Sequence, residues 1–177
     1  RVGAYYHDIG KMVKPDYFIE NQYITDNKHD VIKPTISAKI IRNHVNDGLQ
    51  LAKEYGLPKV VSDFIPMHHG TTRVEYFYRQ ALEEVNGDQS KIDESQFRYP
   101  GPKPNTKETG ILMICEAIEA AVRSIKNPDI IKIEAMIDKI IKQRIDDNQL
   151  SDCPLTLDEL TKIKGTVDGN TGMLHVL

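Results

Sequence analysis

Apolar residues recur at helical spacing along most of this 177-residue chain, and that periodicity restricts its fold more than any other feature. In the stretch 36–52, the apolar positions at this spacing are Ile36, Ile40, Ile41, Val45, Leu49 and Ala52. Side chains three or four positions apart share one face of a helix, whereas a half-buried strand requires strict alternation of apolar and polar residues. No segment shows convincing alternation, so the chain is predicted to be all-α.

Local signals predict where the helices begin and end. Pro34 suits a first helical position, where its missing N–H has no intrahelical partner, and Gly56 followed by Pro58 predicts a C-terminus. Thr156 with Glu159 forms a capping-box pattern. We predict helices over about 34–55, 58–69, 73–86, 106–126 (capped by Asn105 and Glu108), 130–141 and 157–164. The inward face of the helix over 106–126 is expected to carry Leu112, Met113, Glu116 and Ala120. The remaining predictions are a helix end over 1–13, a loop over 14–33, a long loop or lid over 87–104, and a loose tail over the last dozen residues.

The composition is that of one soluble globular domain, with 40% hydrophobic residues, 28% charged residues and a formal net charge of -3. A nucleic-acid footprint normally requires a basic stripe, and none is evident, so we exclude nucleic acid as a partner. Cys115 and Cys153 form no CxxC pattern, and the apolar run around Cys115 predicts a buried free thiol in a reducing compartment. No apolar stretch approaches the ~20 residues that span a bilayer.

Histidines and one aspartate form the clearest chemical pattern. The dipeptide His7-Asp8 is followed by His44, on the face of Ile40 and Ile41, and by the pair His68-His69, at a helix end that Pro66 should kink. Imidazole and carboxylate ligands suit iron, manganese and zinc, and the absence of thiolate argues against a structural zinc site. Taken separately, a histidine on an apolar face is more often a core residue, and a His-His pair can be a helix C-cap. Together they favour a metal-dependent hydrolase.

Several motifs resemble one known family. They are Tyr5–Lys11 (YYHDIGK), Phe18–Gln22 (FIENQ), His68–Thr72 (HHGTT), Phe97–Pro104 (FRYPGPKP) and Glu119–Ser124 (EAAVRS). With the spacing of its histidines, the chain resembles the HD-domain metal-dependent phosphohydrolase superfamily. Within that superfamily it looks like the cytoplasmic HD domain of bacterial seven-transmembrane-HD receptors, the PgpH-type cyclic di-AMP phosphodiesterases. The resemblance covers nearly the whole chain.

The resemblance implies that residues 1–177 form a single HD-domain helical bundle holding two divalent ions, iron or manganese. It implies hydrolysis of cyclic di-AMP to pApA by attack of a metal-activated hydroxide on phosphorus. The implied metal ligands are His7, Asp8 (as the bridge), His44, His68 and His69. Lys11 would face a phosphate oxygen or the departing oxyanion and so share catalysis with Asp8. The domain would lie at the cytoplasmic face of the cell membrane, in a membrane-embedded parent protein whose oligomeric state the sequence leaves open.

The chain departs from the family pattern in two places. The family has a further histidine upstream of the His-Asp pair, and this chain, which starts at Arg1, is expected to be a fragment that lacks the preceding helix or helices. Where the family has an aspartate ligand, register places Glu116, which is one methylene longer. We expect Glu116 to serve as a metal ligand with reduced metal affinity or a changed metal preference.

Candidate substrate contacts are Lys11, Thr71, Arg98, Tyr99 and Lys103. Arginine pairs with phosphate and tyrosine can stack on adenine, but the proline-rich loop could equally be a rigid element anchored by Tyr99, and Thr71 could belong to a simple turn. Two alternative functions stay open. One is an HD hydrolase acting on another nucleotide, and the other is a regulatory nucleotide-binding module with weak or no hydrolysis.

Three further polar groups are predicted to lie outside the site. His29-Asp30 is predicted to serve a loop or helix entry, His175 to be solvated, and Arg123 to pair with Glu119.

Overall fold

The fold is all-α, as predicted, in a computed structural model that describes residues 1–21, 27–166 and 171–177. Every regular element of these residues is an α-helix or a 3-10 helix. None of the described helices is long and apolar enough to cross a membrane. The chain divides into two compact units, unit 1 (Arg1–Pro66 and Thr71–Gly101) and unit 2 (Met67–Gly70 and Pro102–Leu177). That the two units form one HD domain stays a prediction.

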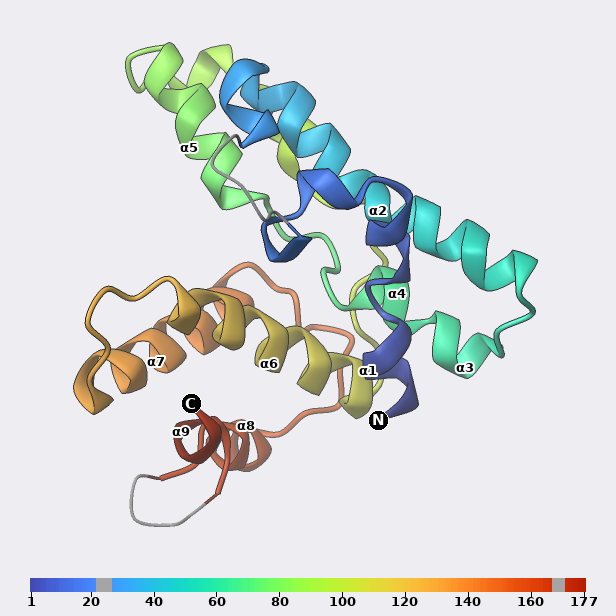
Figure 1. Cartoon of the computed structure of the whole chain (residues 1–177). Helices are drawn as coiled ribbons and strands as arrows, with labels where there is room; N and C mark the ends of the chain where they lie inside the picture. The colour runs from blue at the N-terminus through green and yellow to red at the C-terminus, as the bar shows by residue number, and fades with distance from the viewer. Residues whose placement is uncertain (22–26, 167–170) are drawn as a thin grey trace. The chain divides into compact units, whose positions relative to one another are not determined.

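Unit 1 is built around the long helix α2. Its α-helices are α1 (Val2–Tyr6), α2 (Pro34–Glu54), α3 (Lys59–Ser62), α4 (Phe64–Met67, whose last residue enters unit 2) and α5 (Glu75–Glu84). Its 3-10 helices are η1 (Ile9–Val13), η2 (Pro15–Tyr17), η3 (Ile19–Asn21), η4 (Lys28–Val31), η5 (Gln89–Lys91) and η6 (Glu94–Phe97). Helix α5 packs alongside the first half of α2 (Figure 1), and η1 packs against α2 further along.

The ends of α2 follow the local signals in its sequence. Pro34 occupies the first turn, and Gly56, at φ +64°, follows the C-cap residue Tyr55. One side of the helix is buried through Ala38, Val45 and Ala52, together with His44. Two residues that the periodicity placed with this stripe are not buried: Ile36 is 48% exposed and Leu49 is 37% exposed.

The predicted helix over residues 1–13 is interrupted at the His-Asp dipeptide, where an α-helix gives way to a 3-10 helix. Helix α1 ends at Tyr6, and a 3-10 helix, η1, begins at Ile9. The predicted loop over 14–33 contains three short 3-10 turns, η2 to η4, and residues 22–26 of that loop lie outside the described residues. Over residues 1–21 and 27–33, the described part of this stretch, the chain is therefore a succession of short helical turns.

The predicted helix over 58–69 is broken into α3 and α4. The break falls at Asp63, three residues before Pro66, because proline has no N–H for the Ser62 carbonyl and its ring crowds that carbonyl. Gly70, at φ +54°, ends the segment just after the histidine pair. The predicted helix over 73–86 is α5.

Within the predicted loop or lid over 87–104, hydrogen bonds and ion pairs fix residues 94–99 to the rest of unit 1. The Val74 N–H donates to the Phe97 carbonyl at 2.8 Å, and the Tyr99 N–H donates to the Thr72 carbonyl at 2.9 Å. Arg73 and Arg98 both bind the Glu94 carboxylate, at 2.9 and 2.6 Å. Backbone hydrogen bonds and ion pairs thus connect residues 94–99 to residues 72–74, which follow the histidine pair.

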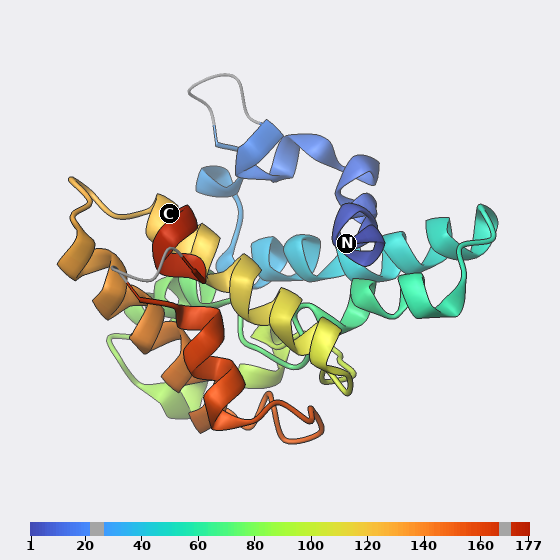
Figure 2. The ribbon, with the colours of Figure 1, turned by 90° about the horizontal axis from the view of Figure 1, so that it is seen from below.

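Unit 2 consists of α6 (Lys107–Arg123), α7 (Ile130–Asp146), α8 (Leu157–Lys164) and α9 (Met173–Val176). Helices α6 and α7 lie side by side in two perpendicular views (Figure 1, Figure 2). Their core comprises Ile114, Ile118, Val122, Ile133, Ile137, Ile140, Leu160 and Leu174. The prediction of a loose tail was wrong over residues 173–176, because Leu174 packs into this core as part of α9. Residues 167–170 of the tail lie outside the described residues.

One helix start was predicted correctly and one was displaced. Thr156 and Glu159 form the predicted capping box of α8, with the Thr156 N–H donating to Glu159 Oε2 at 2.9 Å. The predicted cap at Asn105 was wrong by one residue. Thr106 caps α6. Its hydroxyl accepts from the Thr109 N–H at 3.2 Å, and the Thr109 hydroxyl accepts from the Thr106 N–H. A threonine can close the box because its hydroxyl both donates and accepts.

The inward face of α6 was predicted only in part. Met113 is buried as expected, but Ala120 is exposed, and Ile114 and Ile118 fill the core instead. Cys115 is half-buried rather than fully buried, and its burial raises the pKa of its thiol.

Candidate metal centre

In unit 1 the structure gathers three predicted site residues around the carboxylate of a fourth, Asp8. Asp8 Oδ2 lies 3.3 Å from His7 Nε2, and Asp8 Oδ1 lies 3.3 Å from His44 Nε2. Lys11 Nζ lies 2.7 Å from Asp8 Oδ2. His44 is 1% exposed, whereas the Asp8 side chain is 25% exposed, so the carboxylate lies between a buried ring and the surface. Both Asp8 oxygens therefore face an imidazole nitrogen, an arrangement in which a carboxylate can bridge.

Backbone carbonyls set the orientation of both imidazoles. His7 Nδ1 lies 2.7 Å from the Ala4 carbonyl oxygen, and His44 Nδ1 lies 2.6 Å from the Ile41 carbonyl oxygen. Because a carbonyl oxygen only accepts, each Nδ1 must carry the proton and donate it. In a neutral ring, Nε2 is then the lone-pair nitrogen, and it is directed toward Asp8. A metal-ligating histidine commonly donates its other N–H to a carbonyl in this way.

Two aromatic rings pack against the His44 ring. The His44 ring makes edge contacts with Phe18, at 5.8 Å between centroids, and with Tyr99, at 6.0 Å. Tyr99 is 7% exposed and packs in the same cluster as Val45 and Ile65. These contacts favour the anchoring role of Tyr99 over stacking on a base, and a substrate role for Tyr99 stays a prediction.

Lys11 lies between two carboxylates. Besides Asp8, its ammonium binds Glu20 through a short ion pair, and it lies 5.4 Å from the centroid of the Phe18 ring. Burial alone would lower the pKa of Lys11, but attraction to Asp8 and hydrogen bonds to Asp8 and Glu20 outweigh that effect and raise the Lys11 pKa. Lys11 is therefore a cation at neutral pH. Glu20 was missed as a site residue, although it belongs to the FIENQ motif.

Glycine allows the His-Asp segment to approach α2 closely. A Cβ atom on Gly10 would lie 1.8 Å from the His44 carbonyl oxygen and 2.5 Å from the Gly48 nitrogen. The η1 backbone therefore rests directly on the α2 backbone at the turn that carries His44. This contact places Asp8, two residues before Gly10, within reach of the His44 ring.

Unit 2 brings together the other three predicted metal ligands. The rings of His68 and His69 lie 3.9 Å apart between centroids, and His69 Nδ1 lies 3.9 Å from Glu116 Oε2 of α6. His68 is 1% exposed. A Cβ on the following residue, Gly70, would lie 2.7 Å from Gln149 Oε1, so the buried Gln149 side chain packs against the backbone of Gly70, next to the histidine pair in the chain. The sequence offered no signal for Gln149.

The other predicted residues lie in well-defined contacts. Arg98 donates to the Thr71 carbonyl at 2.9 Å and pairs with Glu94, while Lys103 donates to the Ser151 hydroxyl at 3.3 Å. These side chains are partly exposed, and their substrate roles stay predictions.

Three side chains predicted to lie outside the site follow expectation. Arg123 Nε donates to Glu119 at 3.1 Å, as predicted, and His175 is exposed. His29 lies in η4 with its Nε2 2.9 Å from the Tyr17 carbonyl oxygen, consistent with a role in its loop.

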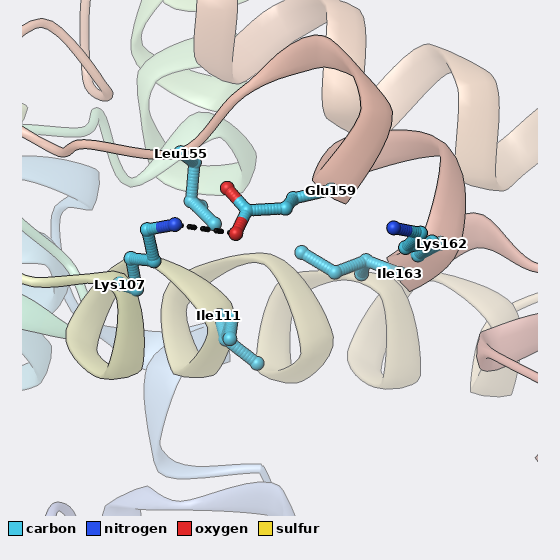
Figure 3. Close-up of a pocket in the computed structure, with 6 residues that line it drawn as sticks. All are labelled: Lys107, Ile111, Leu155, Glu159, Lys162 and Ile163. Atoms are coloured by element: carbon cyan, nitrogen blue, oxygen red, sulfur yellow. Dashed lines mark hydrogen bonds and ion pairs between the residues drawn. The ribbon is translucent and has the colours of Figure 1, made fainter.

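A separate hollow of about 250 Å³ lies between α6 and α8 in unit 2 (Figure 3). Its walls are Lys107, Ile111, Leu155, Glu159, Lys162 and Ile163, and none of these is a predicted site residue. Lys107 and Glu159 form an ion pair across it, and this hydrogen bond is the main reason why the pKa of Glu159 falls to about 2.

Comparison with known proteins relates both clusters to one family. The HD domain family matches residues 1–121. The chain is 47% identical over 167 residues to the cyclic-di-AMP phosphodiesterase PgpH of Bacillus subtilis (strain 168), covering 94% of this chain and 23% of that protein. The protein of the same name from Listeria monocytogenes is 45% identical over 167 residues, with the same coverage. This chain thus spans about a quarter of the length of these relatives.

A solved structure shares the fold. The crystal structure of the L. monocytogenes phosphodiesterase PgpH HD domain in complex with cyclic-di-AMP matches with a TM-score of 0.85 and 44% sequence identity. The match covers 90% of this chain and 73% of that one. The resemblance inferred from the sequence motifs is confirmed.

Proposed function

The chain belongs to the HD-domain family, and on that premise we propose that it hydrolyses cyclic di-AMP to pApA as a metal-dependent phosphodiesterase. One observation carries the proposal most directly. Asp8 lies between the Nε2 atoms of His7 and His44, next to the cation of Lys11, in a chain that is 44% identical to a phosphodiesterase HD domain solved with cyclic-di-AMP.

The donor set suits divalent cations. Imidazole nitrogens and carboxylate oxygens are ligands of iron, manganese and zinc, and the two clusters contain no thiolate. We assign two ions, iron or manganese, to six ligands: His7, Asp8 and His44 of unit 1, and His68, His69 and Glu116 of unit 2. When bound, two such ions supply Lewis acidity and activate a water for attack on phosphorus.

The chain's own residues would then orient and neutralise the substrate. The carbonyls of Ala4 and Ile41 hold the proton of each imidazole on Nδ1, which leaves Nε2 as the ligand. Lys11 carries a positive charge and can donate to a phosphate oxygen or to the departing oxyanion, whose charge it stabilises. Thr71, Arg98, Tyr99 and Lys103 are the further candidates for contact with the dinucleotide.

We extend the proposal to the parent protein. The domain would act at the cytoplasmic face of the cell membrane, as part of a membrane-embedded protein, because the family it resembles is of that kind. The chain has Glu116 where the resemblance implies an aspartate, and this difference keeps a second function open. A nucleotide-binding module with weak or no hydrolysis would result if Glu116 ligates poorly.

Turnover of cyclic di-AMP in Mn²⁺ by the full-length protein tests the assignment. Asp8→Ala should abolish metal-supported formation of pApA, whereas Asp30→Ala, in the exposed part of the second His-Asp dipeptide, should leave it unchanged. Normal turnover in Asp8→Ala would sink the proposal. Tight cyclic di-AMP binding without hydrolysis at saturating Mn²⁺ or Fe²⁺ would favour the binding module, and faster turnover of another nucleotide would favour the other hydrolase.

A further inference from the structure

Glu20 is a carboxylate of unit 1 that the proposed mechanism does not use. It lies in η3, nine positions after Lys11 in η1, and its carboxylate binds the Lys11 ammonium. The Glu20 side chain is 37% exposed and the Lys11 side chain is 20% exposed. Within the described ranges, Asp8 and Glu20 are the two acidic groups that form ion pairs with Lys11.

The two carboxylates around Lys11 differ in what else they touch. Asp8 Oδ2, which accepts from Lys11 at 2.7 Å, also lies 3.3 Å from His7 Nε2, and its second oxygen faces His44. The ammonium therefore occupies a lone-pair direction of the same carboxylate that is proposed to ligate metal. An oxygen shared in this way is a weaker ligand, because the ammonium competes with the cation for it.

Bound divalent cations would also repel the ammonium directly. Charges a few ångströms apart repel strongly at the dielectric of a partly buried site. Lys11 would therefore be pushed away from Asp8 just when its charge is needed beside the phosphate. A second anion bound to the ammonium offsets both effects, and the Glu20 carboxylate forms such an ion pair with Lys11.

We propose that Glu20 is a positioning residue that acts through Lys11. Its carboxylate draws the ammonium from Asp8 and holds it beside the metal site, which frees the Asp8 oxygens for the cations. This inference rests on the proposed function, since it requires Asp8 to be a metal ligand. Glu20 need not touch substrate or metal for it to hold.

Mn²⁺ affinity of the 177-residue chain, measured by calorimetry without substrate, provides a readout separate from activity. Glu20→Gln keeps the size of the side chain and one acceptor oxygen but removes its charge. It should weaken Mn²⁺ binding about fivefold, which is the effect of one partly exposed ion pair. Glu84→Gln, an exposed glutamate on α5, removes the same charge elsewhere in unit 1 and should have no effect.

A double-mutant cycle with Lys11→Met decides whether Glu20 acts through Lys11. Lys11→Met alone should tighten Mn²⁺ binding, and adding Glu20→Gln to it should change the affinity less than about twofold. An equal loss in both backgrounds would overturn the inference, because Glu20 would then act on the metal directly. No loss in Glu20→Gln while Asp8→Ala abolishes binding would overturn the inference alone. Binding that survives Asp8→Ala would overturn both the metal site and the role of Glu20.

Discussion

Substitution of Gly10 by alanine should damage the proposed metal site without replacing any of its proposed ligands. Gly10 has a backbone conformation that alanine readily adopts, since its φ is not positive. The obstacle is the neighbouring helix. The new Cβ would lie 1.8 Å from the His44 carbonyl oxygen and 2.5 Å from the Gly48 nitrogen, and both are backbone atoms that cannot swing aside.

The size of the effect follows from this geometry. Real Cβ atoms essentially never approach a heavy atom closer than 3.0 Å, so η1 and α2 must separate by at least 1.2 Å, the difference between 3.0 and 1.8 Å. Overpacking of this kind costs about 1–3 kcal/mol of stability. A metal site tolerates ligand displacements of only ~0.2 Å. Since Asp8 moves with η1 and His44 with α2, we expect Mn²⁺ affinity to fall about tenfold or more.

Thermal unfolding and Mn²⁺ calorimetry of the same samples separate the two effects. Gly56→Ala is the matched control, because Gly56 has a φ of +64° and nothing within 4 Å of its added Cβ. That variant should lose about 1–2 kcal/mol from backbone strain alone. It should keep wild-type affinity for Mn²⁺, because Gly56 follows the C-terminal end of α2, whereas His44 lies in the middle of that helix.

Wild-type Mn²⁺ affinity in Gly10→Ala would refute the reasoning. It would mean either that the two backbones separate without moving Asp8 or that Asp8 and His44 do not share a cation. A loss of affinity in Gly56→Ala equal to that in Gly10→Ala would refute it as well, because destabilisation alone would then explain the result.

Two further predictions concern carboxylates of unit 2. The pKa of Glu159 is lowered to about 2 from an ordinary 4.5, mainly by its hydrogen bond with Lys107, so its contribution to stability is present above pH 4.5 and is lost as the pH falls from 4.5 to 2. Denaturant unfolding across that range should show the wild-type advantage over Glu159→Gln shrinking with acidification, and a constant difference would contradict this. Glu116→Asp, which restores the shorter side chain that the resemblance implies, should raise Mn²⁺ occupancy several-fold. Identical metal occupancy and turnover in parent and variant would count against a strained Glu116 ligand.

The parts of the fold that were predictable depend on short-range interactions. Pro34 begins α2, and Thr156 with Glu159 begins α8, because the groups that satisfy a helix start lie within four residues of one another. Gly56 and Gly70 end their segments for the same local reason, namely their freedom to adopt positive φ. Such signals can be found in one sequence without knowledge of the fold.

Burial was harder to predict, because it depends on what packs against a helix. Ile36 and Leu49 fit the apolar periodicity of α2 yet remain solvated, while the small Ala38 and Gly48 face neighbouring elements. A periodic pattern identifies one face of a helix but cannot say how much of that face a partner covers. Ala120 on α6 was misplaced for the same reason.

The sequence by itself determined the all-α class, most helix boundaries and the residue types of the proposed ligands, because side-chain type and helical period are local properties. Only the tertiary structure decided that Gly10 rests on the His44 backbone and that Glu20 shares Lys11 with Asp8. The Gly10 and Glu20 contacts join segments separated by several turns of irregular chain. Where these segments meet depends on how many residues pack together, and no single motif encodes that packing.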